Sequence, residues 1–92
     1  MLNMKMPLRK NEFVQVKTVE GKKILFNLDD GIVLRVNDVS SFLWEMIDGH
    51  HSGQDLAQTL TERFEVEPGI AYKDIRGVLE TFFKDEFIDY VK

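Results

Sequence analysis

The sequence predicts an α+β protein of the winged helix-turn-helix type, in which a three-stranded antiparallel sheet precedes three helices. Two observations lead to this prediction. Residues 13–36 hold three short apolar runs separated by glycine-containing turns, a pattern typical of a strand meander. From residue 37 onward the apolar residues recur at helical spacing in three blocks. Strands followed by helices in this order favour an α+β fold.

The three strands are expected over residues 13–19, 23–28 and 32–36. Gly21 supplies the first turn, and Asp30–Gly31 between two apolar runs is a strong hairpin signal. In a simple meander the third strand lies at an edge of the sheet, with one row of its backbone groups unpaired. Such an edge is either covered by a helix or the tail, or is open to an added peptide strand.

The first helix is expected to begin after Asn37 or Asp38, either of which can accept a hydrogen bond from the first turn. Its apolar face is spaced i, i+3, i+4, i+7, i+8 and is followed by Gly49, which is expected to end the helix. The face consists of Val39, Phe42, Leu43, Met46 and Ile47.

The remaining elements are two further helices and a short tail. Ser52, followed three residues later by Asp55, resembles a capping box for a helix that reaches Phe64. Pro68 suits the first turn of the third helix, which is expected to extend to about Asp85. Residues 87–92 alternate between apolar and polar, which predicts a short strand or a packed tail.

The length of the chain, 92 residues, suits one small domain, and we expect residues 1–92 to form it. Residues 1–11 are polar and interrupted by Pro7, so a loose arm is expected there. The start lacks a signal-peptide pattern, and no apolar run has the roughly 20 residues of a membrane span. We therefore expect a soluble, cytoplasmic protein that does not contact a membrane.

Composition and motifs argue against most kinds of chemistry. The net charge of −4 disfavours nucleic acid as a partner, and the absence of cysteine excludes disulfides and thiol catalysis. His50 and His51 are adjacent, whereas metal-binding pairs prefer a spacing such as i, i+4. The sequence has no Gly-x-Ser-x-Gly motif and no phosphate-binding loop. We expect no enzymatic activity, no catalytic residue, no metal and no cofactor.

The third helix contains one residue that its apolar stripe does not explain. Gly77 lies in the helix interior, where glycine costs about 1 kcal/mol relative to alanine. Either another backbone approaches closely at this point, or an exposed glycine is simply tolerated. Ile70, Asp74, Gly77 and Thr81 form one row of the helix. That row is expected to form the wall of a groove whose floor is the edge of the third strand.

Three segments of the chain resemble the PqqD-like family of peptide-recognition domains. The most specific pattern is Asn37, Trp44 and Asp48–Gly49, within residues 33–49. Residues 52–64 and 74–82 resemble the family's second and third helices, so that the resemblance covers residues 24–88. The chain departs from the family at Glu86, where a glycine is often found, and it matches poorly before Ile24.

The resemblance implies a stand-alone recognition element for a ribosomally synthesised and post-translationally modified peptide. Its partners would be the precursor's leader peptide and a biosynthetic enzyme (a leader peptidase, cyclase or radical enzyme), as in lasso-peptide and related natural-product pathways. The chain is expected to be a monomer or weak dimer. The leader would add as a strand to the third strand and lie against the third helix. The implied contact residues are Ile32, Val33, Leu34, Arg35, Val36, Ile70, Asp74, Gly77, Val78 and Thr81. Asn37 and Trp44 would hold the strand–helix junction and the core.

Two alternatives come from other classes of protein. A winged-helix DNA-binding regulator would need a basic recognition helix, yet the second helix carries Asp55 and Glu62 beside Arg63. An interaction subunit for a folded protein would use exposed aromatic residues near the C-terminus.

Overall fold

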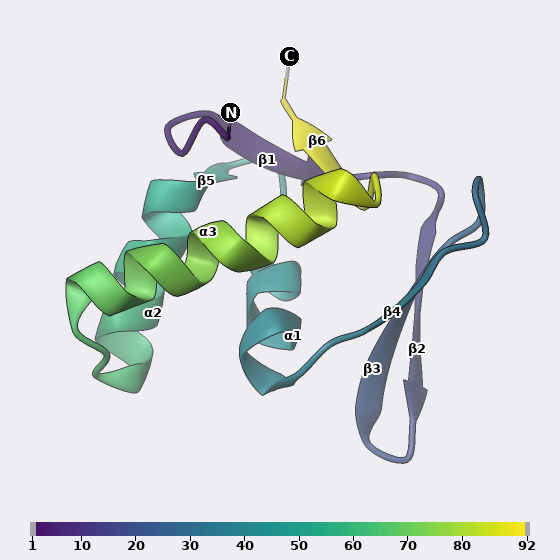
Figure 1. Ribbon diagram of the computed structural model, residues 1–92, viewed down its shortest axis with the longest axis horizontal. Helices are drawn as coiled ribbons and strands as arrows, with labels where there is room; N and C mark the ends of the chain where they lie inside the picture. The colour runs from purple at the N-terminus through teal and green to yellow at the C-terminus, as the bar shows by residue number, and fades with distance from the viewer. Residues whose placement is uncertain (1, 92) are drawn as a thin grey trace.

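The structure, a computed structural model, describes residues 2–91 and places three helices beside two small sheets (Figure 1). The larger sheet is an antiparallel meander of β2 (Val14–Val19), β3 (Lys22–Asn27) and β4 (Val33–Arg35), in that order. It is followed by α1 (Asp38–Met46), α2 (Gly53–Phe64) and α3 (Pro68–Lys84). The predicted α+β fold, with a three-stranded sheet before three helices, is confirmed.

The second sheet was not predicted, and it corrects the expectation of a loose N-terminal arm. In this sheet β1 (Pro7–Lys10) lies between β5 (His51–Ser52) and β6 (Ile88–Tyr90). The Leu8 side chain is fully buried, and the Leu8 carbonyl accepts a 2.8 Å hydrogen bond from the Gly49 amide. The strand is stabilised by partners about forty and about eighty residues away in the sequence. Local composition therefore gave no sign of it. Met1, the first residue of the expected arm, lies outside the described residues.

The core lies between the helices and is joined by one side of each sheet. Its fully buried members come from β1, β3, all three helices and the tail: Leu8, Leu25, Leu43, Ile47, Leu56, Ile75, Leu79 and Phe87. Trp44 packs edge-to-face on Phe82, with ring centroids 5.6 Å apart. This contact joins α1 to α3, which places Trp44 in the core.

The helix starts follow the expected capping chemistry. The Asn37 side chain accepts a 2.8 Å hydrogen bond from the Ser40 amide, so Asn37 and not Asp38 caps α1. Ser52 and Asp55 form a complete capping box at α2, and Pro68 opens α3. Helix α1 ends at Met46, before the expected Gly49. Gly49 instead takes a φ of +90° in the turn toward β5.

The tail reverses direction at Glu86 and then pairs with β1. Glu86 has a φ of +60°, a left-handed conformation that glycine adopts more easily. Its carbonyl accepts hydrogen bonds from the side-chain amides of Asn11 and Asn27, at 2.8 and 3.2 Å. Phe87 follows and is fully buried. The departure from the family at this position is therefore accommodated by the backbone without loss of the tail strand. Lys92 lies outside the described residues.

Helices of the described part of the chain are too short or too polar to cross a membrane.

The burial of Leu8 predicts that β1 is essential to stability. Replacing Leu8 with alanine should lower the free energy of unfolding by about 2–5 kcal/mol, because it leaves a cavity in the core. Met6→Ala is the matched control, since Met6 is 37% exposed and precedes the same strand. Urea denaturation measures both variants. Equal, small effects of the two substitutions would contradict the packing of β1 against the core.

Candidate functional site

An open groove of about 580 Å³ lies between β4, the start of α1 and the second half of α3. In Figure 1, α3 crosses the molecule above the segment that leads from β4 into α1. Residues of the strand and the strand–helix junction form one wall: Leu34, Arg35, Val36, Asn37, Val39 and Ser40. Residues of α3 form the other wall: Lys73, Asp74, Gly77, Val78, Thr81 and Phe82.

Seven of the ten contact residues implied by the resemblance lie around this groove. They are Leu34, Arg35, Val36, Asp74, Gly77, Val78 and Thr81. Three others do not line it. Ile32 and Val33 precede the lined part of the strand. Ile70 lies one turn before Asp74 on α3 and is more than half exposed.

Five residues line the groove that sequence reasoning did not assign to it: Asn37, Val39, Ser40, Lys73 and Phe82. The sequence assigns Asn37 and Val39 structural roles, as a helix cap and as part of an apolar helix face. Helical periodicity places a residue on one face, and it does not indicate that a residue at a helix end also borders a groove. Lys73 lies beside the predicted row of α3 that contains Asp74 and Gly77, and no pattern in the sequence indicates that it borders a groove.

The edge of β4 is open toward the groove. The Asn27 amide donates to the Ile32 carbonyl at 2.9 Å, and the Val36 amide donates to the Lys23 carbonyl at 3.2 Å. Backbone groups alternate in direction along an antiparallel strand. The N–H and C=O groups of Val33 and Arg35 therefore point away from β3. Within residues 2–91, β4 pairs with β3 and with no other strand, so this edge is not covered by the tail.

The groove is apolar at its floor and charged along its rim. Buried or partly buried apolar side chains form the floor, namely Leu34, Val36, Val78 and Phe82. The exposed charged residues Arg35, Lys73 and Asp74 lie along the rim. A groove of this kind suits an extended peptide, whose backbone can pair with the strand edge while apolar side chains enter the floor.

A salt bridge holds the strand–helix junction beside the groove. The Lys23 ammonium on β3 hydrogen-bonds to the Glu45 carboxylate on α1. This hydrogen bond lowers the pKa of Glu45 below its ordinary value, and the charges of Lys23 and Lys10 add to the effect. The pair joins β3 to α1 at the point where the chain leaves the sheet, and its contribution to stability is modest because both side chains are partly exposed.

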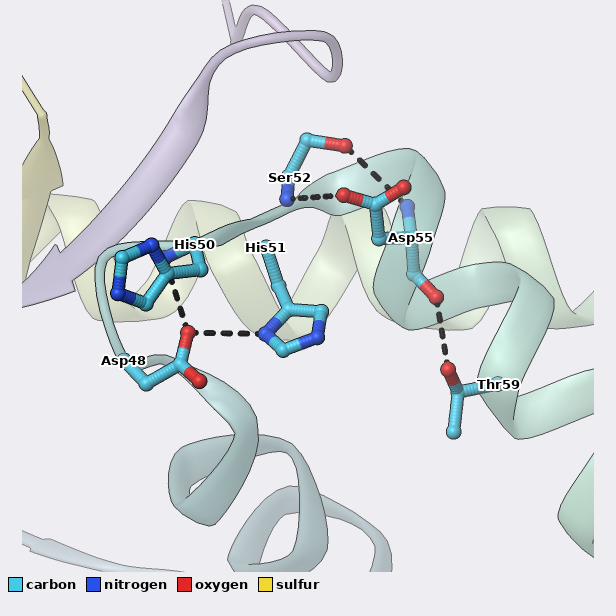
Figure 2. A network of polar contacts seen from close by, with 6 residues as sticks. All are labelled: Asp48, His50, His51, Ser52, Asp55 and Thr59. Atoms are coloured by element: carbon cyan, nitrogen blue, oxygen red, sulfur yellow. Dashed lines mark hydrogen bonds and ion pairs between the residues drawn. The ribbon is translucent and has the colours of Figure 1, made fainter.

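The two histidines belong to a turn that joins α1 to α2, shown in Figure 2. The Asp48 carboxylate accepts hydrogen bonds from the His50 amide at 2.9 Å and from His51 Nδ1 at 2.8 Å. These bonds lower the pKa of Asp48, with the His50 amide as the larger cause. Across residues 2–91, no group of three histidine or acidic side chains is placed to hold a metal ion.

The fold and the groove define a small domain with an open strand edge facing a helix, and the comparisons give its family. Residues 22–88 match the family described as "Coenzyme PQQ synthesis protein D (PqqD)". This match spans well over half of the chain, and the chain therefore belongs to the PqqD family.

Solved structures share this fold at low sequence identity. One is described as "Lasso peptide synthetase B1 complexed with the leader peptide"; it has a TM-score of 0.78 and 23% identity, covering 90% of this chain and 98% of that one. TbiB1 in complex with the TbiA(beta) leader peptide has a TM-score of 0.78 and 15% identity, covering 91% and 99% of the two chains.

A third structure is the PqqD truncation of Methylobacterium extorquens PqqCD, described as a functional and stand-alone RiPP recognition element. It has a TM-score of 0.78 and 18% identity, covering 97% of this chain and 95% of that one. At such identities the likeness establishes the fold. No curated protein matches the chain significantly.

The hydrogen bonds to Asp48 predict a carboxyl titration midpoint below the ordinary value of 3.8. Because the folded pKa is lowered, the stabilisation by Asp48 is complete above pH 3.8 and is lost as pH falls through the folded value. The midpoint is measured by NMR of the Asp48 carboxyl carbon. His51→Ala should reduce the shift without abolishing it, since the His50 amide remains. A midpoint at or above 3.8 in the unmodified protein would contradict this account.

Proposed function

We propose that this protein binds the leader peptide of a ribosomally synthesised precursor by strand addition to β4, and presents the precursor to a modifying enzyme or leader peptidase. It performs no chemical step itself. One observation carries the proposal: the unpaired backbone groups of Arg35 border a groove with an apolar floor, and those of Val33 continue the same open edge just before it. Two of the solved structures with this fold are described as leader-peptide complexes, which supports the choice of ligand.

The binding reaction follows from the direction of the backbone groups on β4. Val33 and Arg35 together offer two N–H donors and two C=O acceptors to an incoming strand. Alternate side chains of that strand would point into the groove, against Leu34 and Val78, and the others toward solvent. Main-chain bonds supply affinity in this mode, and the groove supplies specificity. A preformed groove also lowers the ordering cost of binding.

The proposed contact surface keeps all ten residues implied by the resemblance and adds the start of α1. Val33 contributes its outward backbone groups, since its side chain lies outside the groove. Both backbone groups of Ile32 are bonded within the chain, so Ile32 contributes its exposed side chain just beyond the groove. Ile70 extends the α3 wall by one turn, where its exposed side chain can meet a leader longer than the groove. Val39 on α1 and Lys73 on α3 are additional lining residues.

Presentation to an enzyme follows from effective concentration. A leader held on β4 keeps the remainder of the precursor tethered near any enzyme that also binds this protein. A micromolar to nanomolar complex corresponds to a net binding free energy of about 8–12 kcal/mol. The kind of enzyme and the class of peptide are properties of the partner, which the groove itself does not specify.

The structure favours neither of the two alternatives from other classes. A DNA-binding regulator would need a basic α2, but Asp55 and Glu62 are exposed there, and the Arg63 guanidinium lies 5.1 Å from the Phe42 ring centroid. An interaction subunit would need exposed aromatic residues near the C-terminus. Phe87 is fully buried, and Tyr90 is partly buried against Phe83.

Val33→Pro is expected to weaken leader binding by about tenfold or more, because proline removes an outward N–H donor at the strand edge. Proline at this position disrupts no hydrogen bond to β3. Val16→Pro is the matched control, since Val16 also has an outward N–H but lies on the opposite edge, β2.

The leader encoded beside the gene is titrated against both variants by calorimetry at low micromolar protein, with circular dichroism to verify the fold. Binding that survives Val33→Pro with the fold intact, or that falls equally with Val16→Pro, would refute strand addition to β4.

Two substitutions at Gly77 give a second prediction: a small side chain should raise the stability of the helix, and a large one should lower the affinity for the leader. Apart from its two chain neighbours and the adjacent backbone of α3, no described atom lies within 4 Å of a Cβ at this position, so Gly77→Ala should stabilise α3 by about 0.5–1 kcal/mol. The larger Gly77→Leu should fill the groove and weaken leader binding about tenfold or more. Arg76→Leu, on the next residue and outside the groove lining, is the control. Unchanged affinity in Gly77→Leu would show that the leader does not approach this wall.

A further inference from the structure

The outer edge of β2 is open, since no other strand of residues 2–91 pairs with it. The Leu28 amide donates to the Phe13 carbonyl at 2.9 Å, which fixes the alternation along β2. Val14, Val16 and Thr18 therefore direct their backbone groups away from β3. The Val14 amide donates to the Asn11 carbonyl, but the amides of Val16 and Thr18 have no partner in the described chain. An open edge of six residues is a template for pairing with another strand.

The usual protection against edge pairing is weak on this strand. Lys17 is the one charged residue of β2, and its Nζ lies 5.5 Å from the ring centroid of Phe26 on β3. The ammonium is thus turned inward across the sheet and does not guard the edge. Val16 and Val19 remain 42% and 50% exposed. The strand has neither proline nor a bulge within it.

We propose that β2 pairs antiparallel with β2 of a second copy of this chain, about a two-fold axis through Val16. In this register Val16 faces its own copy, Val14 faces Thr18, and Gln15 faces Lys17. The outward groups match as an antiparallel ladder requires: the Val16 amides and carbonyls of the two copies pair with each other, and each Thr18 amide can donate to the Val14 carbonyl of the other copy. The Val14 amide keeps its bond to the Asn11 carbonyl. No like charges oppose each other within the strands. Five residues of each strand are paired.

Every other symmetric register is poorer. Centring the pair on Lys17 also joins five residues of each strand, but it places Lys17 directly opposite Lys17 of the second copy, which is destabilising. Centring on Gln15 or Thr18 pairs only three residues of each strand. If the two-fold axis passes between two residues, each residue with outward backbone groups faces a residue whose backbone groups point toward β3, and no ladder forms. The sequence of β2 therefore specifies a single self-complementary register.

The arrangement leaves the proposed leader site accessible. The β2–β3–β4 sheet stands to one side of the helices in Figure 1, and β2 is the edge strand opposite β4. The combined sheet would have the order β4-β3-β2-β2-β3-β4, with one groove at each outer end. The inference does not depend on the proposed function. Because five cross-strand pairs form a smaller contact than a standard interface, the association should be weak and concentration-dependent.

Sedimentation equilibrium of the full chain from micromolar to millimolar concentration tests the dimer. The expected weight-average mass rises from 10.7 kDa toward twice that value. Val16→Lys and Val16→Glu should each weaken association about tenfold or more, since each places like charges on the axis. An equimolar mixture of the two should restore association, because lysine then faces glutamate.

Val33→Lys on β4 is the control and should leave association unchanged, since Val33 is similarly exposed at the opposite edge. Circular dichroism verifies that each variant is folded. A mass that stays at 10.7 kDa throughout the concentration range would overturn the proposal. So would association that is insensitive to both Val16 substitutions, or a lysine–glutamate mixture that behaves like its components.

Discussion

The groove depends on how the larger sheet is fixed to the helices at its two ends. At one end the side chain of Asn27, only 1% exposed, donates to the carbonyls of Asp85 and Glu86 just beyond α3, both at 3.2 Å. The Asn27 side-chain oxygen accepts a hydrogen bond from the Asp29 backbone amide. Both the nitrogen and the oxygen of this buried side chain are therefore hydrogen-bonded. At the other end the Asn37 cap begins α1 directly after the sheet, and the partly exposed salt bridge between Lys23 and Glu45 lies at the same junction. Between these two junctions, residues of β4 and of α3 line the groove from opposite sides.

This arrangement gives the two edges of one sheet different surroundings. Beside β4 the unpaired backbone groups meet an apolar floor and the α3 wall, which favours a flexible peptide that becomes ordered on binding. Within residues 2–91 no other strand pairs with the outer edge of β2, and the self-complementary sequence of β2 favours an identical strand. Binding without catalysis suits a scaffold of this kind, since it needs a fixed edge and a shaped wall and no activated side chain. The lowered pKa values of Glu45 and Asp48 follow from structural hydrogen bonds outside the groove.

The sequence predicts those features of the fold that local chemistry determines. Periodicity and turn residues identify the β2–β4 meander and the three helices, and capping chemistry identifies Asn37, Ser52 and Pro68. Strand β1 was missed because its stability comes from contacts distant in sequence, which composition near Pro7 does not reveal. The groove was predicted in outline, from an edge strand and the row around Gly77. The part of the groove formed by the start of α1 was not predicted, because helix capping by Asn37 and the apolar face containing Val39 already explain why these residues are there.

Amide hydrogen exchange by NMR, with and without the leader peptide encoded beside the gene, tests the central claim most directly. In the free protein the amides of Val33 and Arg35 should exchange rapidly, whereas the Leu34 amide, which faces β3, should already be protected. Saturating leader should slow exchange at Val33 and Arg35 and leave Leu34 nearly unchanged. Binding that leaves both outward amides in rapid exchange, or that protects Val16 and Thr18 on the opposite edge instead, would contradict strand addition to β4.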